Sequence, residues 1–302
     1  MKNIIEYYYN FYNVNVVKEK EKEKWIFFYN NDYYELKRIK RNDIEINDIY
    51  NLIKNNKLYN RIIPTINNTM VMEYENNRYV LEQINKGNIK RKISIKDLLK
   101  KERIYNFSKY KYILRTNWYN LWIEKIDYIV YQREHIKERY LILDQYLDYY
   151  LGLSENAISY INSIGYLKKD ERDIPVISHR RINSIYALEY YEIGNIVLDH
   201  YTRDICEYIK YIFFHEKTDF KAINTIINSI NLSEYGWALF LGRMLFPTYF
   251  FDLYDTIINE EKEETEVRWL INKIEEYESL LKDVCKQINK KTRIPSMNWI
   301  SS

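Results

Sequence analysis

The chain has 302 residues, of which 46% are hydrophobic and 29% charged, a balance typical of a folded protein and not of a disordered one. Its 46 Lys and Arg against 43 Asp and Glu leave a formal net charge of +3, which argues against the strong basic excess of a nonspecific nucleic-acid binder. We therefore expect no nucleic acid among its partners, and a chain long enough for two lobes with buried cores.

Two residue types are used unusually. There are 33 Tyr, which either reflect an AT-rich genome or a surface selected for cross-linking or carbohydrate contact. Glycine is scarce, with six in the chain, and none precedes Gly87. Because glycines let a backbone approach phosphates closely, the first 86 residues contain no glycine-rich phosphate loop.

Cys206 and Cys285 lack the spacing of a zinc site or a disulfide framework, and we expect Cys206 to be a buried thiol on a helix. The N-terminal MKNIIEYYYNFYN has no apolar core of a secretory peptide. Residues 237–251 are apolar but are interrupted by Arg243 and Pro247, which makes them too short to span a bilayer. These features predict a cytoplasmic protein.

The first 86 residues are predicted to be mainly strands. Residues 24–39 form two strands joined at Asn30-Asn31-Asp32, and residues 69–84 form a second hairpin with its tip at Glu75-Asn76-Asn77. Between them, residues 43–58 have apolar side chains at helical spacing. We expect a small sheet with one helix against it.

Residues 86–103 contain eight basic and two acidic side chains and are either an anion-binding patch or a solvated connector with one short helix. After residue 105 the pattern is mainly helical. The predicted helices cover residues 118–139, 204–214, 221–230, 237–245 and 260–281. The last is expected to be one long exposed helix with a buried stripe formed by Val267, Leu270, Ile271, Ile274 and Tyr277.

A β-rich segment followed by a helical one predicts an α+β protein with an N-lobe at residues 1–86 and a C-lobe at residues 87–302. The space between two such lobes would be the default place for a ligand.

Several segments, in order, resemble one family. Residues 149–158, YYLGLSENAI, resemble a signature stretch of the YutH-like spore coat proteins, which are related to the CotS spore coat family and more distantly to aminoglycoside and choline phosphotransferases. Further segments that resemble this group are residues 65–87, 177–181 (ISHRR), 198–211 (LDHYTRDICEYIKY), 242–255 and 293–300. The resemblance covers roughly residues 30 to 300. It implies a protein-kinase-like two-lobed fold, deposition on the spore coat from the mother-cell cytoplasm, and other coat proteins as partners.

A phosphotransferase of this fold needs a cover over the phosphates, a Lys that orients them, an Asp that positions the acceptor hydroxyl, and an Asp that holds magnesium. The glycine-free N-lobe has no such cover. Lys37 falls on the strand where relatives carry their Lys, although it could equally be a surface Lys on an edge strand. Glu45 is a weak candidate for its partner.

The triplet His179-Arg180-Arg181 stands where active relatives carry a catalytic Asp. Arginine stays protonated and cannot accept a proton from a hydroxyl, so the position is degenerate. His179 is either a substitute base or a structural support of the loop. Two guanidinium groups here would attract phosphate without acting as a base.

Asp199 follows the apolar run NIVL, as a magnesium-binding Asp would, and is a candidate metal ligand. Only four residues separate it from Asp204, which we expect to be structural, capping its helix and pairing with a neighbour such as Arg203 or Arg181. A single carboxylate is a thin basis for magnesium.

The sequence therefore predicts a pseudokinase with a structural or assembly role in the spore coat, no catalytic residue and no cofactor. Its cleft could still bind an anionic or sugar-like ligand through Arg180, Arg181 and Lys37. The alternative is an active small-molecule phosphotransferase with displaced catalytic residues, which would use Mg-ATP.

Overall fold

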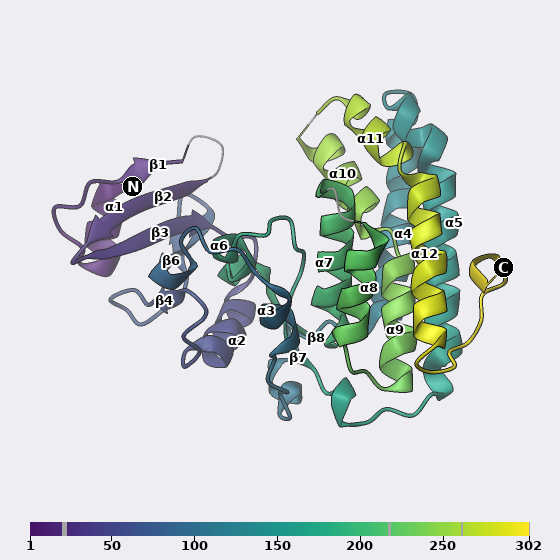
Figure 1. The fold of residues 1–302 in the computed structure, drawn as a ribbon. Coiled ribbons are helices and arrows are strands. Elements are labelled where there is room, and N and C mark those ends of the chain that lie inside the picture. The colour runs from purple at the N-terminus through teal and green to yellow at the C-terminus, as the bar shows by residue number, and fades with distance from the viewer. Residues whose placement is uncertain (20–22, 217–218, 261, 302) are drawn as a thin grey trace. The chain divides into compact units, whose positions relative to one another are not determined.

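The computed structural model describes residues 1–19, 23–216, 219–260 and 262–301 (Figure 1). The chain divides into two units. The first is made of Met1–Lys100, Ile104–Leu114 and Ile177–Leu198, and the second of Lys101–Arg103, Arg115–Val176 and Asp199–Ser302. The boundary expected between residues 86 and 87 falls inside the first unit, which also takes up a loop from much later in the chain. A β-rich unit and a larger helical one confirm the predicted α+β class.

The first unit contains an antiparallel sheet in which the strand order is β1-β2-β3-β6-β4, with β5 also pairing with β6. The strands are β1 (Val17–Lys18), β2 (Lys24–Tyr29), β3 (Asp32–Arg38), β4 (Arg61–Ile63), β5 (Met72–Tyr74) and β6 (Asn77–Gln83).

Two tight turns confirm both predicted hairpins. Asn30 and Asn31 have φ of 47° and 67° between β2 and β3, and Glu75 and Asn76 have φ of 48° and 60° between β5 and β6. Two-residue hairpin turns favour positive φ at both central positions, and asparagine tolerates it better than most residues. In a region without glycine, asparagine thus supplies most of the turn chemistry.

The side chains of β3 and β6 alternate between two faces of the sheet. Leu36 and Leu81 share one face with Ile5 of α1 (Lys2–Tyr9), a helix that the sequence analysis did not predict. Lys37 and Glu82 each follow one of these leucines by one residue, so their side chains lie on the other face of the sheet. The sheet therefore has one apolar face and one face with a charged site.

Helix α2 (Asp43–Ile53) confirms the predicted helix between the hairpins, although it ends at Ile53 and not at residue 58. Asn42 accepts a hydrogen bond from the backbone N–H of Glu45, and the Glu45 carboxylate accepts one from that of Asn42. This reciprocal capping box fixes the start of the helix.

The rest of the first unit is built from short elements. These are η1 (Lys86–Asn88), α3 (Ile95–Leu99), η2 (Phe107–Tyr110), α6 (Ala187–Tyr190) and η5 (Ile193–Asn195). A separate two-stranded sheet pairs β7 (Val176–His179) with β8 (Ile196–Asp199). Helix α3 is the short helix expected in the basic connector.

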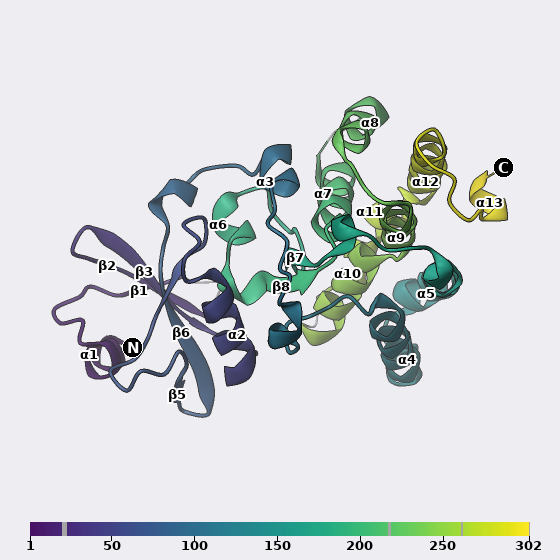
Figure 2. The ribbon, with the colours of Figure 1, turned by 90° about the horizontal axis from the view of Figure 1, so that it is seen from below.

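Helix α9 (Glu234–Leu245) is almost completely buried and packs on α5 (Leu141–Ser163), α7 (Thr202–His215) and α12 (Ile274–Asn289) (Figure 2). A Cβ atom at Gly242 would come within 2.5 Å of Ile161 Cδ1, so α9 and α5 approach closely there. The remaining helices are α4 (Trp118–Ile136), η3 (Ile164–Tyr166), η4 (Glu171–Asp173), α8 (Phe220–Ser229), α10 (Thr248–Asn259), η6 (Glu264–Val267), α11 (Arg268–Ile271) and α13 (Asn298–Ser301).

No helix in the described part of the chain has both the length and the apolar character needed to cross a membrane.

The predicted single helix over residues 260–281 is wrong. Helix α10 ends at Asn259, and η6, α11 and the start of α12 follow as separate pieces; residue 261 lies outside the described residues. Like-charged glutamates three and four residues apart, such as Glu260, Glu263 and Glu264, destabilise a continuous helix. Val267, Leu270 and Tyr277 of the predicted stripe are buried all the same.

Candidate functional site

The first of the candidate site residues, Lys37, is buried on β3. Its Nζ forms an ion pair with Glu82 of β6 and another, at 2.9 Å, with Oε1 of Glu192, which follows α6. Glu35 is also close enough to raise its pKa. Lys37 is therefore enclosed by carboxylates of its own unit and is not a surface side chain of an edge strand.

The charges around Lys37 are strongly coupled. Burial opposes its charged form, but the carboxylates of Glu82, Glu192 and Glu35 outweigh burial and raise the pKa of Lys37 above its usual value. Burial raises the pKa of Glu82. A cation that already faces several carboxylates offers little attraction to a phosphate.

Glu45, the weak candidate for a partner of Lys37, closes the capping box of α2 and lies 3.7 Å from the Arg41 guanidinium. The observed partners Glu82 and Glu192 were not identified from the sequence. Glu82 sits in an alternating strand pattern that predicts only its face, and Glu192 is 155 residues from Lys37, so no local pattern links them.

The triplet His179-Arg180-Arg181 runs from the last residue of β7 into the loop between β7 and β8. Asn195 links the two ends of this loop. The carbonyl of Asn195 accepts a hydrogen bond from the Arg180 N–H at 2.7 Å. The Asn195 side chain accepts a hydrogen bond from the N–H of Arg181 and donates one to the carbonyl of Arg181. The Arg180 side chain is exposed, and Arg181 Nη1 donates to the carbonyl of Arg180 at 2.8 Å. The carboxylate-free triplet thus forms the neck of a closed loop.

His179 is buried between aromatic rings. Its ring centroid lies 3.8 Å from that of Tyr190 and 6.1 Å from that of Tyr59, and Tyr191 packs edge-on against it. Rings packed this way fix the end of β7. This placement supports the structural role considered for His179.

Asp199, at the end of β8, is completely buried in the second unit. Its two carboxylate oxygens accept hydrogen bonds from Trp118 Nε1 at 3.0 and 2.9 Å. Its Oδ1 accepts a third from the backbone N–H of His200 at 2.7 Å, and its Oδ2 forms a close ion pair with Arg203. The carboxylate is therefore saturated by protein donors, one of them cationic.

Asp204 is fully buried in the first turn of α7. The expectation that it caps this helix is wrong, because α7 begins at Thr202 and its N-cap residue is Tyr201. Its carboxylate forms an ion pair with Lys101, a partner that the sequence analysis did not identify. Burial lowers the pKa of Lys101, and the attraction of Asp204 opposes that shift. The pair ties the connector segment Lys101–Arg103 to α7, as a structural residue would.

A magnesium-bound nucleotide is expected only for the alternative, an active phosphotransferase, and the carboxylate of Asp199 does not fit a magnesium ion in its present contacts. Magnesium prefers carboxylate oxygens and water, yet those of Asp199 are occupied by Trp118, Arg203 and a backbone N–H. Across residues 1–19, 23–216, 219–260 and 262–301, no group of three or more His, Cys, Asp or Glu side chains is arranged to hold a metal ion.

Cys206 is buried, with its thiol 3.6 Å from the carbonyl of Phe240, as expected for an inert side chain.

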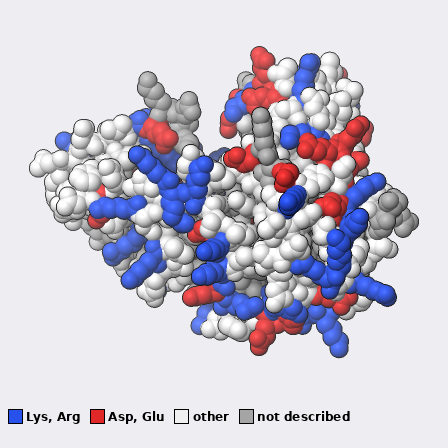
Figure 3. Space-filling model, in the orientation of Figure 1, with Lys and Arg blue, Asp and Glu red and all other residues white. Residues whose placement is uncertain are grey.

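The basic connector at residues 86–103 is partly neutralised. Lys86 forms an ion pair with Asp32 at 2.9 Å, Arg91 forms one with Asp97 at 2.8 Å, and Lys92 lies over the ring of Tyr186. On the face shown in Figure 3, Lys and Arg side chains gather over the first unit, while both signs of charge are mixed over the second. These contacts favour a structural connector, with some basic surface left exposed.

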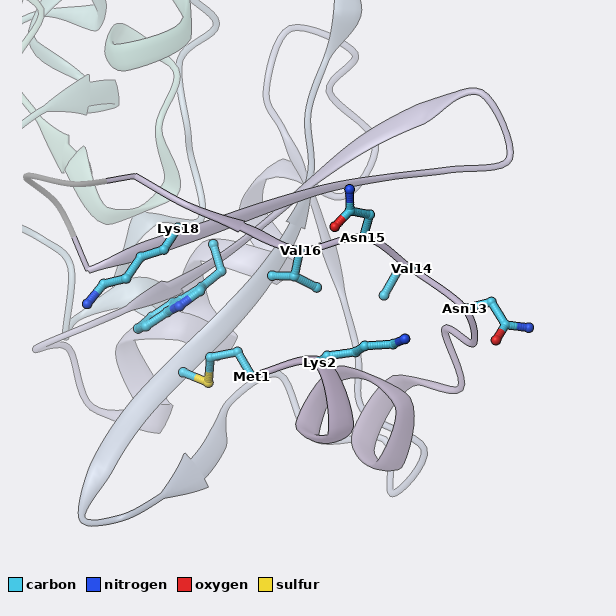
Figure 4. Close-up of a pocket in the computed structure, with 8 residues that line it drawn as sticks. Met1, Lys2, Asn13, Val14, Asn15, Val16 and Lys18 are labelled. Carbon is cyan, nitrogen blue, oxygen red and sulfur yellow. The ribbon is translucent and has the colours of Figure 1, made fainter.

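The cavities of the first unit include two of similar volume. One, of about 520 Å³, is open and lies between the start of α1 and the segment before β2, beside Lys2, Val16 and Lys18 (Figure 4). The other, of about 540 Å³, is lined entirely by the loop between β7 and β8, from Arg181 to Asn195.

Comparison with known proteins identifies a matching family and a related protein. The sequence profile of the family described as "Spore coat putative kinase YutH" matches residues 2–287. A curated relative, the endospore coat-associated protein YutH of Bacillus subtilis, is 26% identical over 210 residues, which cover 61% of this chain and 61% of that protein.

Solved structures share the fold. An aminoglycoside phosphotransferase from Alicyclobacillus acidocaldarius matches with a TM-score of 0.56 at 10% identity, over 91% of this chain and 92% of that one. Spectinomycin phosphotransferase bound to AMP matches with a TM-score of 0.55 at 11% identity, over 94% and 96%. These matches confirm the kinase-like fold, and the profile match over nearly the whole chain shows that it belongs to the YutH family of spore coat proteins.

Proposed function

We propose that this protein is a catalytically inactive, kinase-like component of the spore coat, where it has a structural or assembly role. The observation that carries the proposal is the state of Asp199: its carboxylate is buried and bound by Trp118, His200 and Arg203. Arginine at positions 180 and 181 supports it, because a guanidinium cannot act as a base. The enclosure of Lys37 by Glu82 and Glu192 also supports it.

Loss of a general base costs on the order of 10²–10⁴-fold in rate. Loss of the metal removes the largest charge that stabilises a transferring phosphoryl group. Both losses together leave little phosphotransferase activity to select for, and the protein then contributes through its surface and its stability.

The test of inactivity uses the purified full chain with Mg-ATP and a panel of hydroxyl acceptors. We expect no phosphoryl transfer and no rise in melting temperature with Mg-ATP, whereas a nucleotide present at 100 times its Kd would add about 2.7 kcal/mol of stability. Magnesium-dependent turnover that is lost in Asp199→Asn, but kept in the matched exposed variant Asp219→Asn, would establish the alternative, an active phosphotransferase.

The coat role is supported by family membership and by the coat-associated Bacillus subtilis relative. It implies synthesis in the mother-cell cytoplasm and contacts with other coat proteins. A fluorescent fusion followed through sporulation should move from the mother cell to the forespore periphery. A fusion that stays diffuse after the coat has formed would contradict the role, whatever the protein does with ATP.

A further inference from the structure

The cavity of about 540 Å³ in the loop between β7 and β8 has the properties of a small-molecule site. Its volume lies within the range of ligand pockets. Its lining residues are Arg181, Ile182, Asn183, Ser184, Glu189, Tyr190, Glu192, Gly194 and Asn195. All of them belong to one short stretch of one unit.

The loop that lines this cavity is held from several sides. The Arg41 guanidinium donates to the carbonyls of Gly194 and Ile196 at 3.1 and 2.6 Å. Ile93 N–H donates to the carbonyl of Ile185 at 2.7 Å, and Ala187 N–H donates to that of Arg91 at 2.7 Å. A loop fixed in this way keeps its cavity preformed, so a ligand would not have to order it.

The anchors of the loop are also buried. Ala187 and Ile193 are fully buried, and Ile182 and Tyr190 are nearly so. The polar residues Asn183, Ser184 and Glu189 are among those that line the cavity.

One polar group on this wall has no protein partner. Glu189 Oε2 is buried, and among the described residues it has no hydrogen-bond partner. A buried acceptor left unsatisfied costs about 1–3 kcal/mol, and more when it is charged, so a donor from water, an ion or a ligand would stabilise it. Glu189 is not part of the Lys37 cluster, and the proposed coat role does not use it.

One carboxylate of the wall is available to a cationic group of a ligand. Two carboxylates, Glu189 and Glu192, and one guanidinium, Arg181, line the cavity. The Arg181 guanidinium donates to the carbonyl of Arg180, and Glu192 already receives Lys37. Glu189 thus remains as the carboxylate that can receive a new donor.

We propose that this cavity binds a small organic cation with a primary ammonium group, which donates to Glu189, while the amide of Asn183 and the hydroxyl of Ser184 lie beside its uncharged part. The site is independent of catalysis, because nothing in it requires nucleotide or metal.

Calorimetric titration of the full chain with 1,4-diaminobutane tests the site, with the neutral 1,4-butanediol and inorganic phosphate as comparison probes. We expect the diamine to bind at least tenfold more tightly than the diol, and phosphate not to bind. Glu189→Gln should weaken the diamine by about tenfold, since one charge-assisted hydrogen bond is lost. Glu155→Gln, at an exposed position on α5, is the matched control and should change nothing.

Diamine binding equal to that of the diol, or unchanged in Glu189→Gln, would overturn the proposal, as would preferential binding of phosphate. If Glu189→Gln does not fold, Asn183→Asp decides, because residue 183 is exposed and the added carboxylate should tighten diamine binding. Unchanged or weaker binding in Asn183→Asp would also overturn it. Failure of this site would leave the absence of phosphoryl transfer untouched.

Discussion

Lys37 and Asp199 carry opposite charges, and in both cases buried neighbours of opposite charge neutralise the side chain. In the first unit, a buried cation is surrounded by carboxylates, and in the second a buried carboxylate is surrounded by donors and a cation. Each charge is balanced inside its own unit, and both residues are buried parts of the folded protein.

The largest expected effect comes from Arg203→Met, which leaves Asp199 buried without its cation. Breaking a buried ion pair typically costs about 3–5 kcal/mol, and we expect a loss of that size in the free energy of unfolding, measured with urea. Asp199→Asn in the same chain should recover much of it, because the neutral amide can still accept from Trp118. A single Arg203→Met variant of unchanged stability would show that Asp199 does not need internal neutralisation.

Lys37→Met tests the first unit in the same way. We expect a smaller loss, about 2–4 kcal/mol, because the Glu192 side chain is 30% exposed and water can replace its partner, whereas Glu82 is left buried. The double variant Lys37→Met with Glu82→Gln should be more stable than the single one. If the single and double variants were equally stable, the loss of stability in Lys37→Met would come from lost packing and not from the unpaired charge of Glu82.

Asp173 sharpens the comparison, because its carboxylate is held without a strong cation. Burial raises its pKa, but bonds from His200, Ser233 and the backbone of Asp170 outweigh this and hold the pKa below its ordinary value of 3.8. The stability that this gives is present above pH of about 3.8 and is lost as the pH falls through the lower folded-state pKa.

Asp173→Asn should therefore lower the free energy of unfolding at pH 7 by about 1–3 kcal/mol. The difference from the natural chain should shrink in urea titrations below pH 4. A difference that is constant from pH 7 to pH 3 would contradict the assignment of this pH dependence to Asp173.

The smallest effect concerns the turn between β2 and β3. Asn31→Gly, at φ of 67°, should be neutral or stabilise by about 0.5 kcal/mol, since glycine adopts this conformation at no steric cost. Asn31→Val should destabilise by about 1–2 kcal/mol. Thermal unfolding of both variants checks this, and equal melting temperatures would show that the turn does not constrain the hairpin.

Local patterns were sufficient for the elements whose causes are local. The hairpin at Asn30-Asn31 and the helix α2 were both predicted from a few neighbouring residues. The predicted helix over residues 260–281 failed because charge repulsion and the packing of Val267 broke a pattern that looked continuous. The first unit also includes Ile177–Leu198, a segment far along the chain from the rest of that unit. No local sequence pattern predicts that this segment belongs there.

What the sequence determined by itself was that arginines and no carboxylate follow His179 at positions 180 and 181, and that the N-terminal region has no glycine for a phosphate loop. Only the tertiary structure decided what becomes of the remaining charges. Trp118 reaches Asp199 across 81 residues and Glu192 reaches Lys37 across 155. Ion pairs and hydrogen bonds depend on distance in space, and the order of residues along the chain does not encode that distance until the chain is folded.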